Sequence, residues 1–130
     1  MELILDTNFI ISSIKQKIPL FENLRNNFPE YKIIIPVEVI YEIEKIKDEK
    51  KSTTREKEAA ELSLFLIKKG NYKNISLNSN SVDSGIMNYI IKNPISIVAT
   101  MDRELKEKIK RKVRGAGFMV IRQKSRFIIE

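Results

Sequence analysis

Short apolar runs alternate along this chain with longer segments in which apolar residues recur every three or four positions. The short runs predict buried strands at residues 2–5, 31–35, 95–99 and 118–121, with a further edge strand at residues 126–129. The longer segments predict helices at residues 20–28, 37–46, 59–69, 82–91 and 103–113, the third of them preceded by a capping box from Thr53 to Glu56. Strands joined by helices form a parallel sheet with helices on both faces. We therefore expect an α/β fold whose ligands bind beyond the carboxyl ends of the strands.

The length and composition agree with one globular domain and exclude several kinds of chemistry. The 130 residues, of which 42% are apolar and 32% charged, suit a single domain spanning residues 1–130. The absence of Cys and His excludes cysteine–histidine zinc sites, thiol nucleophiles and Ser-His-Asp triads. The sequence has no run of about 18 apolar residues that could cross a membrane, and no basic signal segment precedes the first strand. We expect a soluble, cytoplasmic protein with no membrane partner.

The positive charge of the chain is concentrated in its last quarter. Residues 1–102 carry 14 Lys and Arg against 14 Asp and Glu, whereas residues 103–130 carry 10 against 3, which accounts for the entire net charge of +7. This distribution favours a polyanionic partner such as nucleic acid. A basic helix that only keeps the protein soluble is the alternative, and charge alone does not separate the two.

Two acidic residues come directly or almost directly after predicted strands. Asp6 follows the strand at residues 2–5, and Asp102 comes just after the strand at residues 95–99. Because these strands are predicted to be parallel, both carboxylates should lie at the carboxyl edge of the sheet. Each residue could instead only cap the helix that follows it, since Asp is a preferred N-cap residue. Position alone leaves both interpretations open.

Two further acids fall near the apolar stripes of predicted helices. Glu42 comes three positions after Val39 and four before Ile46, and Asp83 comes three positions before Ile86. A carboxylate on an apolar face is costly unless a cation, hydrogen bonds or a proton compensate for the lost solvation. We therefore expect both side chains to point inward for a functional reason. The alternative for Asp83 is an ordinary acid near a helix start, where the helix dipole favours negative charge.

Together the four acids point to a metal site. Strand ends and inward helix faces can converge in one crevice, and clustered carboxylates repel each other unless a cation lies between them. Mg²⁺ and Mn²⁺ prefer such oxygen ligands. A bound divalent ion can lower the pKa of an attacking water and neutralise a leaving oxygen, which suits phosphodiester hydrolysis without His or Cys. We expect Mg²⁺ or Mn²⁺ as the cofactor, with four metal-binding catalytic residues, Asp6, Glu42, Asp83 and Asp102.

These acids belong to an ordered series of short motifs that covers essentially the whole chain. The motifs are Leu5-Asp6-Thr7-Asn8, Pro36-x-x-Val39-x-x-Glu42-x-x-x-Ile46, Asp83-x-x-Ile86, Ala99-Thr100-x-Asp102-x-x-Leu105 and Gly117-x-x-Val120-Ile121. In order and spacing they resemble the PIN-domain nucleases. The resemblance implies a three-layer α/β/α sandwich around a central parallel sheet of about five strands, and an endoribonuclease that hydrolyses RNA. It also implies that Asn8 and Thr100 assist catalysis around the metal or the water.

Two positions depart from the common PIN pattern. Met101 stands where many PIN domains have Asn, and Ser84 stands where many have a second acid after the Asp of the third motif. Neither change removes one of the four acids. They could weaken a second metal position, so the number of bound ions stays open.

The resemblance also bears on partners and on the role in the cell. The compact chain with its basic C-terminal segment is most similar to archaeal PIN proteins related to the nuclease of ribosomal RNA processing. A VapC-type toxin ribonuclease paired with an antitoxin protein is the near alternative, and a non-catalytic RNA-binding scaffold is another. Family analogy further implies a homodimer. The residues expected to contact RNA phosphates are Arg103, Lys106, Lys110 and Arg122, and Lys124 extends the same basic surface.

Overall fold

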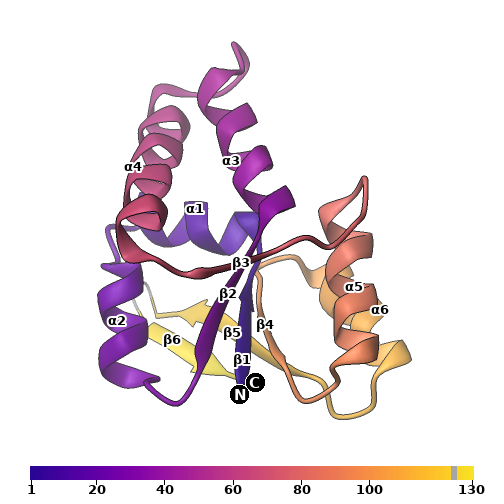
Figure 1. Ribbon diagram of the computed structural model, residues 1–130. Coiled ribbons are helices and arrows are strands. Elements are labelled where there is room, and N and C mark those ends of the chain that lie inside the picture. Colours follow the sequence, from indigo (N-terminus) through magenta and orange to yellow (C-terminus); the bar gives the residue numbers. More distant parts are fainter. Residues whose placement is uncertain (124–125) are drawn as a thin grey trace.

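The computed structural model describes residues 1–123 and 126–130 and contains one six-stranded sheet with helices on both faces (Figure 1). Its strands are β1 (Glu2–Leu5), β2 (Lys32–Pro36), β3 (Lys73–Ile75), β4 (Ile97–Ala99), β5 (Gly117–Arg122) and β6 (Arg126–Ile129). Its helices are α1 (Thr7–Lys15), α2 (Leu20–Asn27), α3 (Val37–Asp48), α4 (Thr54–Gly70), α5 (Val82–Lys92) and α6 (Arg103–Lys112). The α/β sandwich expected from the alternating pattern is confirmed.

The sheet is parallel except at one edge. Its strand order is β3-β2-β1-β4-β5-β6, and every neighbouring pair is parallel apart from β5 and β6. The parallel part therefore has the expected five strands, and β6 confirms the predicted edge strand. Because β1 lies between β2 and β4, the carboxyl ends of these three strands open at the same edge of the sheet.

The structure contains two elements that the sequence pattern did not predict. Helix α1 begins at Thr7, directly after β1, and buries Phe9, Ile10 and Ile11 in succession. A short run of consecutive apolar residues does not by itself distinguish a buried helix from a buried strand. Strand β3 has only three residues, the first two polar and exposed, and it forms because its backbone pairs with β2. Strand β3 depends on its pairing with β2, and helix α1 depends on the elements that pack around it, so neither is recognisable from its own residues.

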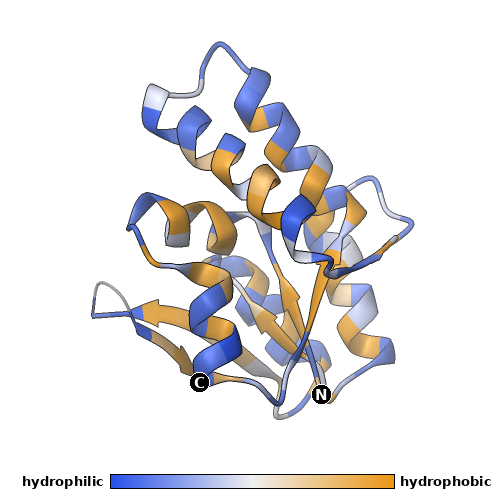
Figure 2. Cartoon of the chain, turned by 60° about the vertical axis from the view of Figure 1, so that its left-hand side comes forward, coloured by the Kyte–Doolittle hydropathy of each residue, from blue (hydrophilic) through white to orange (hydrophobic). Residues whose placement is uncertain are grey.

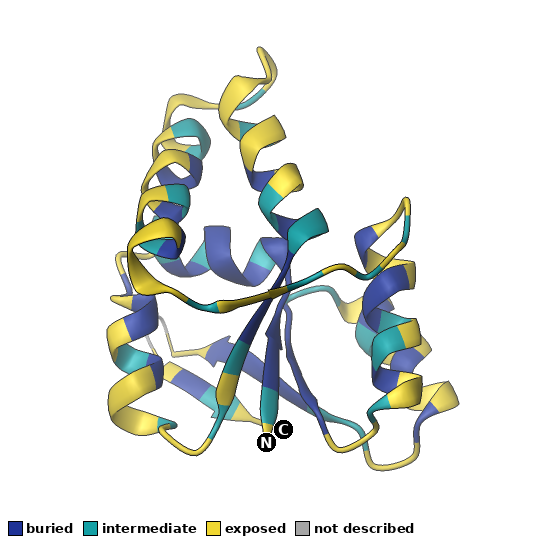
Figure 3. Cartoon of the chain, in the orientation of Figure 1, coloured by how far each residue is buried: buried dark blue, intermediate teal, exposed yellow. Residues whose placement is uncertain are grey.

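The hydrophobic core is centred on β1. Leu3, Ile4 and Leu5 are completely buried, and burial of each such side chain is worth about 1.5–3 kcal/mol. Phe9 of α1 packs against Phe127 of β6 with ring centroids 5.0 Å apart, which joins the first helix to the last strand. Figure 2 shows apolar residues gathered in the strands and on the inward helix faces, and Figure 3 shows the strands of the centre as the most deeply buried part.

Helices α3 and α4 pack side by side and extend past the carboxyl edge of the sheet (Figure 1). The predicted capping box begins α4, with Thr53 Oγ1 accepting from the N–H of Glu56 at 3.1 Å and Glu56 Oε1 accepting from the N–H of Thr53 at 2.9 Å. This helical pair forms a wall beside the edge at which β1, β2 and β4 end. None of the helices in the described part of the chain is both long enough and apolar enough to traverse a lipid bilayer.

Candidate active site

The carboxyl ends of β1, β2 and β4 bring most of the predicted site residues to one edge of the sheet. Asp6 follows β1, Thr100 and Asp102 follow β4, and α3 with Glu42 begins directly after β2. Asp83 lies in the first turn of α5. The parallel arrangement thus gathers residues that are far apart in the sequence, as the alternating pattern predicted.

Asp6 is the buried acid of this edge, with 3% of its surface exposed. Its Oδ1 accepts a hydrogen bond from the backbone N–H of Thr7 at 2.8 Å, and its Oδ2 accepts one from the hydroxyl of Thr100 at 2.7 Å. Burial raises the pKa of Asp6 from 3.8 to about 6 in spite of these hydrogen bonds, and the negative charges of Asp83 and Glu42 raise it too. A nearby cation would stabilise this carboxylate in its charged form.

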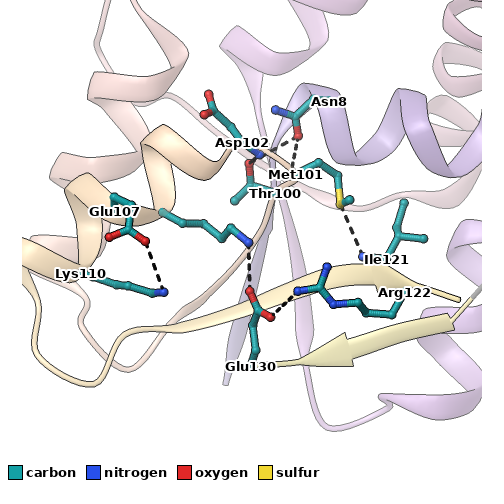
Figure 4. Close-up of polar contacts among 10 residues, drawn as sticks. Asn8, Thr100, Met101, Asp102, Glu107, Lys110, Ile121, Arg122 and Glu130 are labelled. Carbon is teal, nitrogen blue, oxygen red and sulfur yellow. Dashed lines mark hydrogen bonds and ion pairs between the residues drawn. The ribbon is translucent and has the colours of Figure 1, made fainter.

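The hydroxyl of Thr100 connects Asp6 to Asp102. While it donates to Asp6, the hydroxyl oxygen accepts from the backbone N–H of Asp102 at 3.1 Å. Asp102 caps α6, because its Oδ1 accepts from the N–H of Leu105 at 3.1 Å. Asn8 fixes the same loop, with its Oδ1 accepting at 2.9 Å from the N–H of the residue after Thr100 (Figure 4). Asp6 and Asp102 are both helix N-caps and both lie at this edge of the sheet, so the two interpretations of these residues do not exclude each other.

Glu42 is exposed, so the expectation of a buried carboxylate is wrong, although the residue does lie near the apolar face of α3. The buried residues of α3 are Val39 and Ile43, and Glu42 lies about 60° and 100° from them around the helix axis, at the border of the buried face. The hydroxyl of Thr7 donates a hydrogen bond to Glu42 Oε1. The carboxylate of Glu42 therefore faces the sheet edge next to Asp6 while staying accessible to a ligand.

Asp83 is also exposed, so the expectation of a buried carboxylate is wrong here as well. Its helix turns Ile86 to the core and is capped by Ser81, whose Oγ accepts from a backbone N–H of the first turn at 3.4 Å. The carboxylate itself is partly desolvated, which raises the pKa of Asp83, and the negative charge of Asp102 raises it further. Asp83 is thus coupled electrostatically to Asp102 and to Asp6.

A pocket of about 370 Å³ opens at this edge of the sheet. Its lining includes four predicted site residues, Asp6, Asn8, Glu42 and Asp83. Four polar lining residues were not predicted as site residues, namely Thr7, Ser12, Lys15 and Glu56. Ser12 and Lys15 come four and seven positions after Asn8 on α1, a helical spacing that becomes informative once this helix is recognised.

The donor atoms of the site fit a hard divalent cation. Carboxylate and amide oxygens are the ligands that Mg²⁺ and Mn²⁺ prefer, and the chain has no His or Cys to favour a softer ion. In residues 1–123 and 126–130, no three acidic side chains are arranged so that they could bind a metal ion as a group. Three of the four predicted acids line the pocket, and the fourth, Asp102, is joined to Asp6 through Thr100.

Two of the basic residues expected to contact RNA lie freely accessible on α6. Arg103 and Lys110 are both exposed. Lys110 forms a surface ion pair with Glu107 at 3.7 Å, a type of contact that is worth little in water. Lys124, which we expected to extend the basic surface, lies outside the described residues.

The other two basic residues share one acidic partner that the sequence did not reveal. Lys106 on α6 and Arg122 at the end of β5 each form an ion pair with Glu130 at 2.9 Å (Figure 4). These interactions lower the pKa of Glu130, and the hydrogen bond from Lys106 has the largest effect. The carboxylate of Glu130 thus stays charged between the two cations.

Comparison with known proteins assigns this chain to a family. A family model described as a PIN like domain matches residues 3–124. The chain belongs to the PIN family. Ribonuclease VapC4 of Methanocaldococcus jannaschii is 38% identical to this PIN domain over 125 residues, which are 95% of this chain and 92% of the relative. The structure of the PIN domain endonuclease Utp24 matches with a TM-score of 0.78 at 26% identity, covering 99% of this chain and 90% of that one.

Membership of the PIN family confirms the resemblance that the ordered motifs indicated. Because the matched region contains every one of those motifs, the agreement extends from Asp6 to the last motif strand. The family match concerns the chain as a whole and tests no single residue. The roles of the four acids as metal ligands in this PIN domain therefore stay predictions.

Proposed function

We propose that this PIN domain is a metal-dependent endoribonuclease that hydrolyses phosphodiester bonds of RNA. The observation that carries the proposal is the pocket lined by the buried Asp6 and by Glu42 and Asp83, because carboxylate oxygens then line a space open to solvent. The names of two similar proteins support it, one a ribonuclease and the other an endonuclease.

Four acids would hold Mg²⁺ or Mn²⁺ in this proposal: Asp6, Glu42, Asp83 and Asp102. Asp6 supplies the physical reason, since its burial disfavours the charged carboxylate and a neighbouring cation would favour it again. The same cation would reduce the electrostatic repulsion between the carboxylates of Asp83 and Asp102. When bound, the ion supplies a lowered pKa for the attacking water and neutralises charge on the leaving oxygen.

Polar residues of the chain would orient these acids and the substrate. The hydroxyl of Thr100 fixes Oδ2 of Asp6, and the hydroxyl of Thr7 holds Glu42. Asn8 uses its Oδ1 to accept from the loop after β4, so its Nδ2 group is the part that would donate to a water or a phosphate oxygen. Thr100 and Asn8 would therefore have the supporting roles that the family resemblance implies.

The RNA backbone would lie along α6 and the end of β5. Arg103 is the residue directly after Asp102, and Lys106 comes one helical turn after Asp102, so positive charge begins beside the acidic edge. Lys110 and Arg122 extend it. Contacts of this kind position a phosphate backbone without reading the base sequence, so they predict RNA binding and no particular target.

A cleavage assay with purified protein and a structured RNA tests the enzyme directly. We expect EDTA to abolish cleavage, Mg²⁺ or Mn²⁺ to restore it, and Asp6→Asn to remove it in the presence of metal. Full activity in excess EDTA would contradict the metal-dependent mechanism. RNA binding without cleavage in any metal condition would favour the non-catalytic scaffold instead.

The cellular role we propose is processing of ribosomal or other RNA in the cytoplasm, by a single domain that spans residues 1–130 and forms a homodimer. The second candidate is a toxin of a toxin–antitoxin pair, which is favoured by the name of the VapC4 relative. The two roles use the same acids. Co-expression with the product of an adjacent gene separates them, because a protein that binds this chain and blocks its cleavage of RNA would identify a toxin.

A further inference from the structure

Lys106, Arg122 and Glu130 form a charge cluster between α6 and the two last strands (Figure 4). The ammonium of Lys106 donates to Glu130 Oε1, and the guanidinium of Arg122 donates to Glu130 Oε2, both at 2.9 Å. One carboxylate is therefore shared by two cations. The cluster keeps one net positive charge, unlike the one-to-one pair of Lys110 with Glu107 on the same helix.

The backbone fixes Glu130 in this position. Its N–H donates to the carbonyl oxygen of Phe118 at 2.7 Å, and its carbonyl oxygen accepts from the N–H of Phe118 at 3.1 Å, which continues the β5–β6 ladder. Arg122 is four residues further along β5, roughly 13 Å at the usual rise per residue. The side chain of Arg122 turns back along the strand towards Glu130 (Figure 4), away from the edge that carries Asp6 and Asp102.

The shared carboxylate has the character of a phosphate group. It presents two anionic oxygens to two separate cations, as the two non-bridging oxygens of a phosphodiester would. The exposed fraction of the side chains rises from 12% for Lys106 through 33% for Glu130 to 51% for Arg122. An anion from solvent would therefore meet Arg122 first and reach Lys106 by taking the place of the carboxylate.

We propose that Lys106 and Arg122 form a binding site for an RNA backbone phosphate, and that the carboxylate of Glu130 occupies this site in the RNA-free protein. The inference rests on the proposed function, since it takes RNA as the ligand. On binding, the phosphate exchanges with the carboxylate, and both cations keep an anionic partner. Glu130 thereby lowers the affinity of the protein for RNA.

Replacing Glu130 with Gln tests the exchange, because Gln keeps the size and one acceptor oxygen but removes the charge. Binding of a fluorescent single-stranded RNA is measured at 50 to 200 mM salt, with EDTA and in the Asp6→Asn background so that no cleavage occurs. We expect E130Q to bind more tightly and its log–log salt slope to be steeper by about 0.7, because its site meets the one phosphate with one more net positive charge than the parent site. Its advantage over the parent should then fall about 2.6-fold across this range.

Glu107→Gln is the matched control, since it also removes one negative charge from a carboxylate that pairs with a lysine of α6. Lys110 is already half exposed in that pair and available to phosphate, so we expect the salt slope of E107Q to stay unchanged. Equal effects of the two substitutions would show that Glu130 acts only through the net charge of the protein, and would overturn the inference.

A second variant identifies the cation that is released. Adding Arg122→Ala to E130Q should remove most of the gain in salt slope, because the site then again has one net positive charge, as in the parent. Weaker binding by E130Q, or a gain that persists in full in the double variant, would also overturn the inference. Cleavage by the protein with an intact Asp6 is measured separately, so loss of the nuclease proposal would be visible even when the binding results support the phosphate site.

Discussion

Replacing Asp6 with Asn should make the metal-free protein more stable at neutral pH. The reason is the burial of Asp6, which raises its pKa in the folded state from 3.8 to about 6. A carboxyl group with a raised pKa binds its proton more tightly in the folded than in the unfolded protein. The protonated carboxyl group therefore contributes stability at low pH. This contribution is lost as the pH rises from about 4 to about 6 and does not return above that range. Asn has no charge to desolvate and avoids this loss.

The magnitude follows from the two pKa values. At about 1.36 kcal/mol per pH unit, the charged carboxylate of Asp6 costs about 3 kcal/mol at pH 7.5 and about 1 kcal/mol at pH 4.5. Asn is as good an N-cap as Asp and can still accept from the N–H of Thr7. In the variant the hydroxyl of Thr100 loses Oδ2 of Asp6 as its acceptor, which costs about 1 kcal/mol. It can donate to Oδ1 of Asn8 instead, which lies 3.4 Å away. The net gain at pH 7.5 is about 2 kcal/mol.

Urea unfolding of both proteins in EDTA, at pH 4.5 and pH 7.5, measures the effect. The difference in free energy of unfolding between Asp6→Asn and the parent should grow by about 2 kcal/mol from the lower to the higher pH. Asp48→Asn removes a charge from an exposed position and controls for net charge. A difference that stays constant with pH, or a variant less stable than the parent at pH 7.5, would show that Asp6 serves the fold as a cap and hydrogen-bond acceptor and carries no desolvation strain.

Two further predictions concern the other acids and the basic surface. Asp83→Asn should leave the metal-free protein at least as stable, because the pKa of Asp83 is raised by desolvation and by Asp102, and it should remove the stabilisation by Mn²⁺, which is about 2.7 kcal/mol at a hundred times the dissociation constant. Thermal unfolding with and without Mn²⁺ checks this, and marked destabilisation of the metal-free variant with an unchanged Mn²⁺ effect would exclude Asp83 from the metal site. Arg103→Ala and Lys110→Ala should each reduce the salt slope of RNA binding by about 0.7, equally for unrelated sequences. Filter binding over a salt series measures the slope. Unchanged slopes would indicate that the basic residues of α6 only keep the protein soluble.

The sequence by itself determined the architecture and the order of its main elements. Apolar runs at residues 2–5, 31–35, 95–99 and 118–121 became β1, β2, β4 and β5 within a few residues, because strands buried on both faces are apolar throughout. The same pattern places Asp6 and Asp102 at one edge of the sheet, since parallel strands share their carboxyl edge. Local residue pattern and sheet geometry were sufficient for both conclusions.

Elements without a local pattern could not be predicted in this way. Helix α1 buries Phe9, Ile10 and Ile11 because other elements cover it on several sides, and its lining residues Ser12 and Lys15 were missed with it. The three residues of β3 become a strand through backbone pairing with β2. In both cases the decisive interactions come from segments elsewhere in the chain.

Only the tertiary structure decided how deeply each charged group is buried and which partner it has. Apolar spacing predicted an inward Asp83, yet it is Asp6 that is buried. The core formed by several elements closes over the end of β1, whereas the first turn of α5 buries Val82 and leaves Asp83 exposed. Likewise, Lys106 and Arg122 share Glu130, which is 24 and 8 residues away along the chain. Burial and ion pairing depend on which segments meet in space, and a periodicity within one segment contains no information about the charges that another segment brings to it.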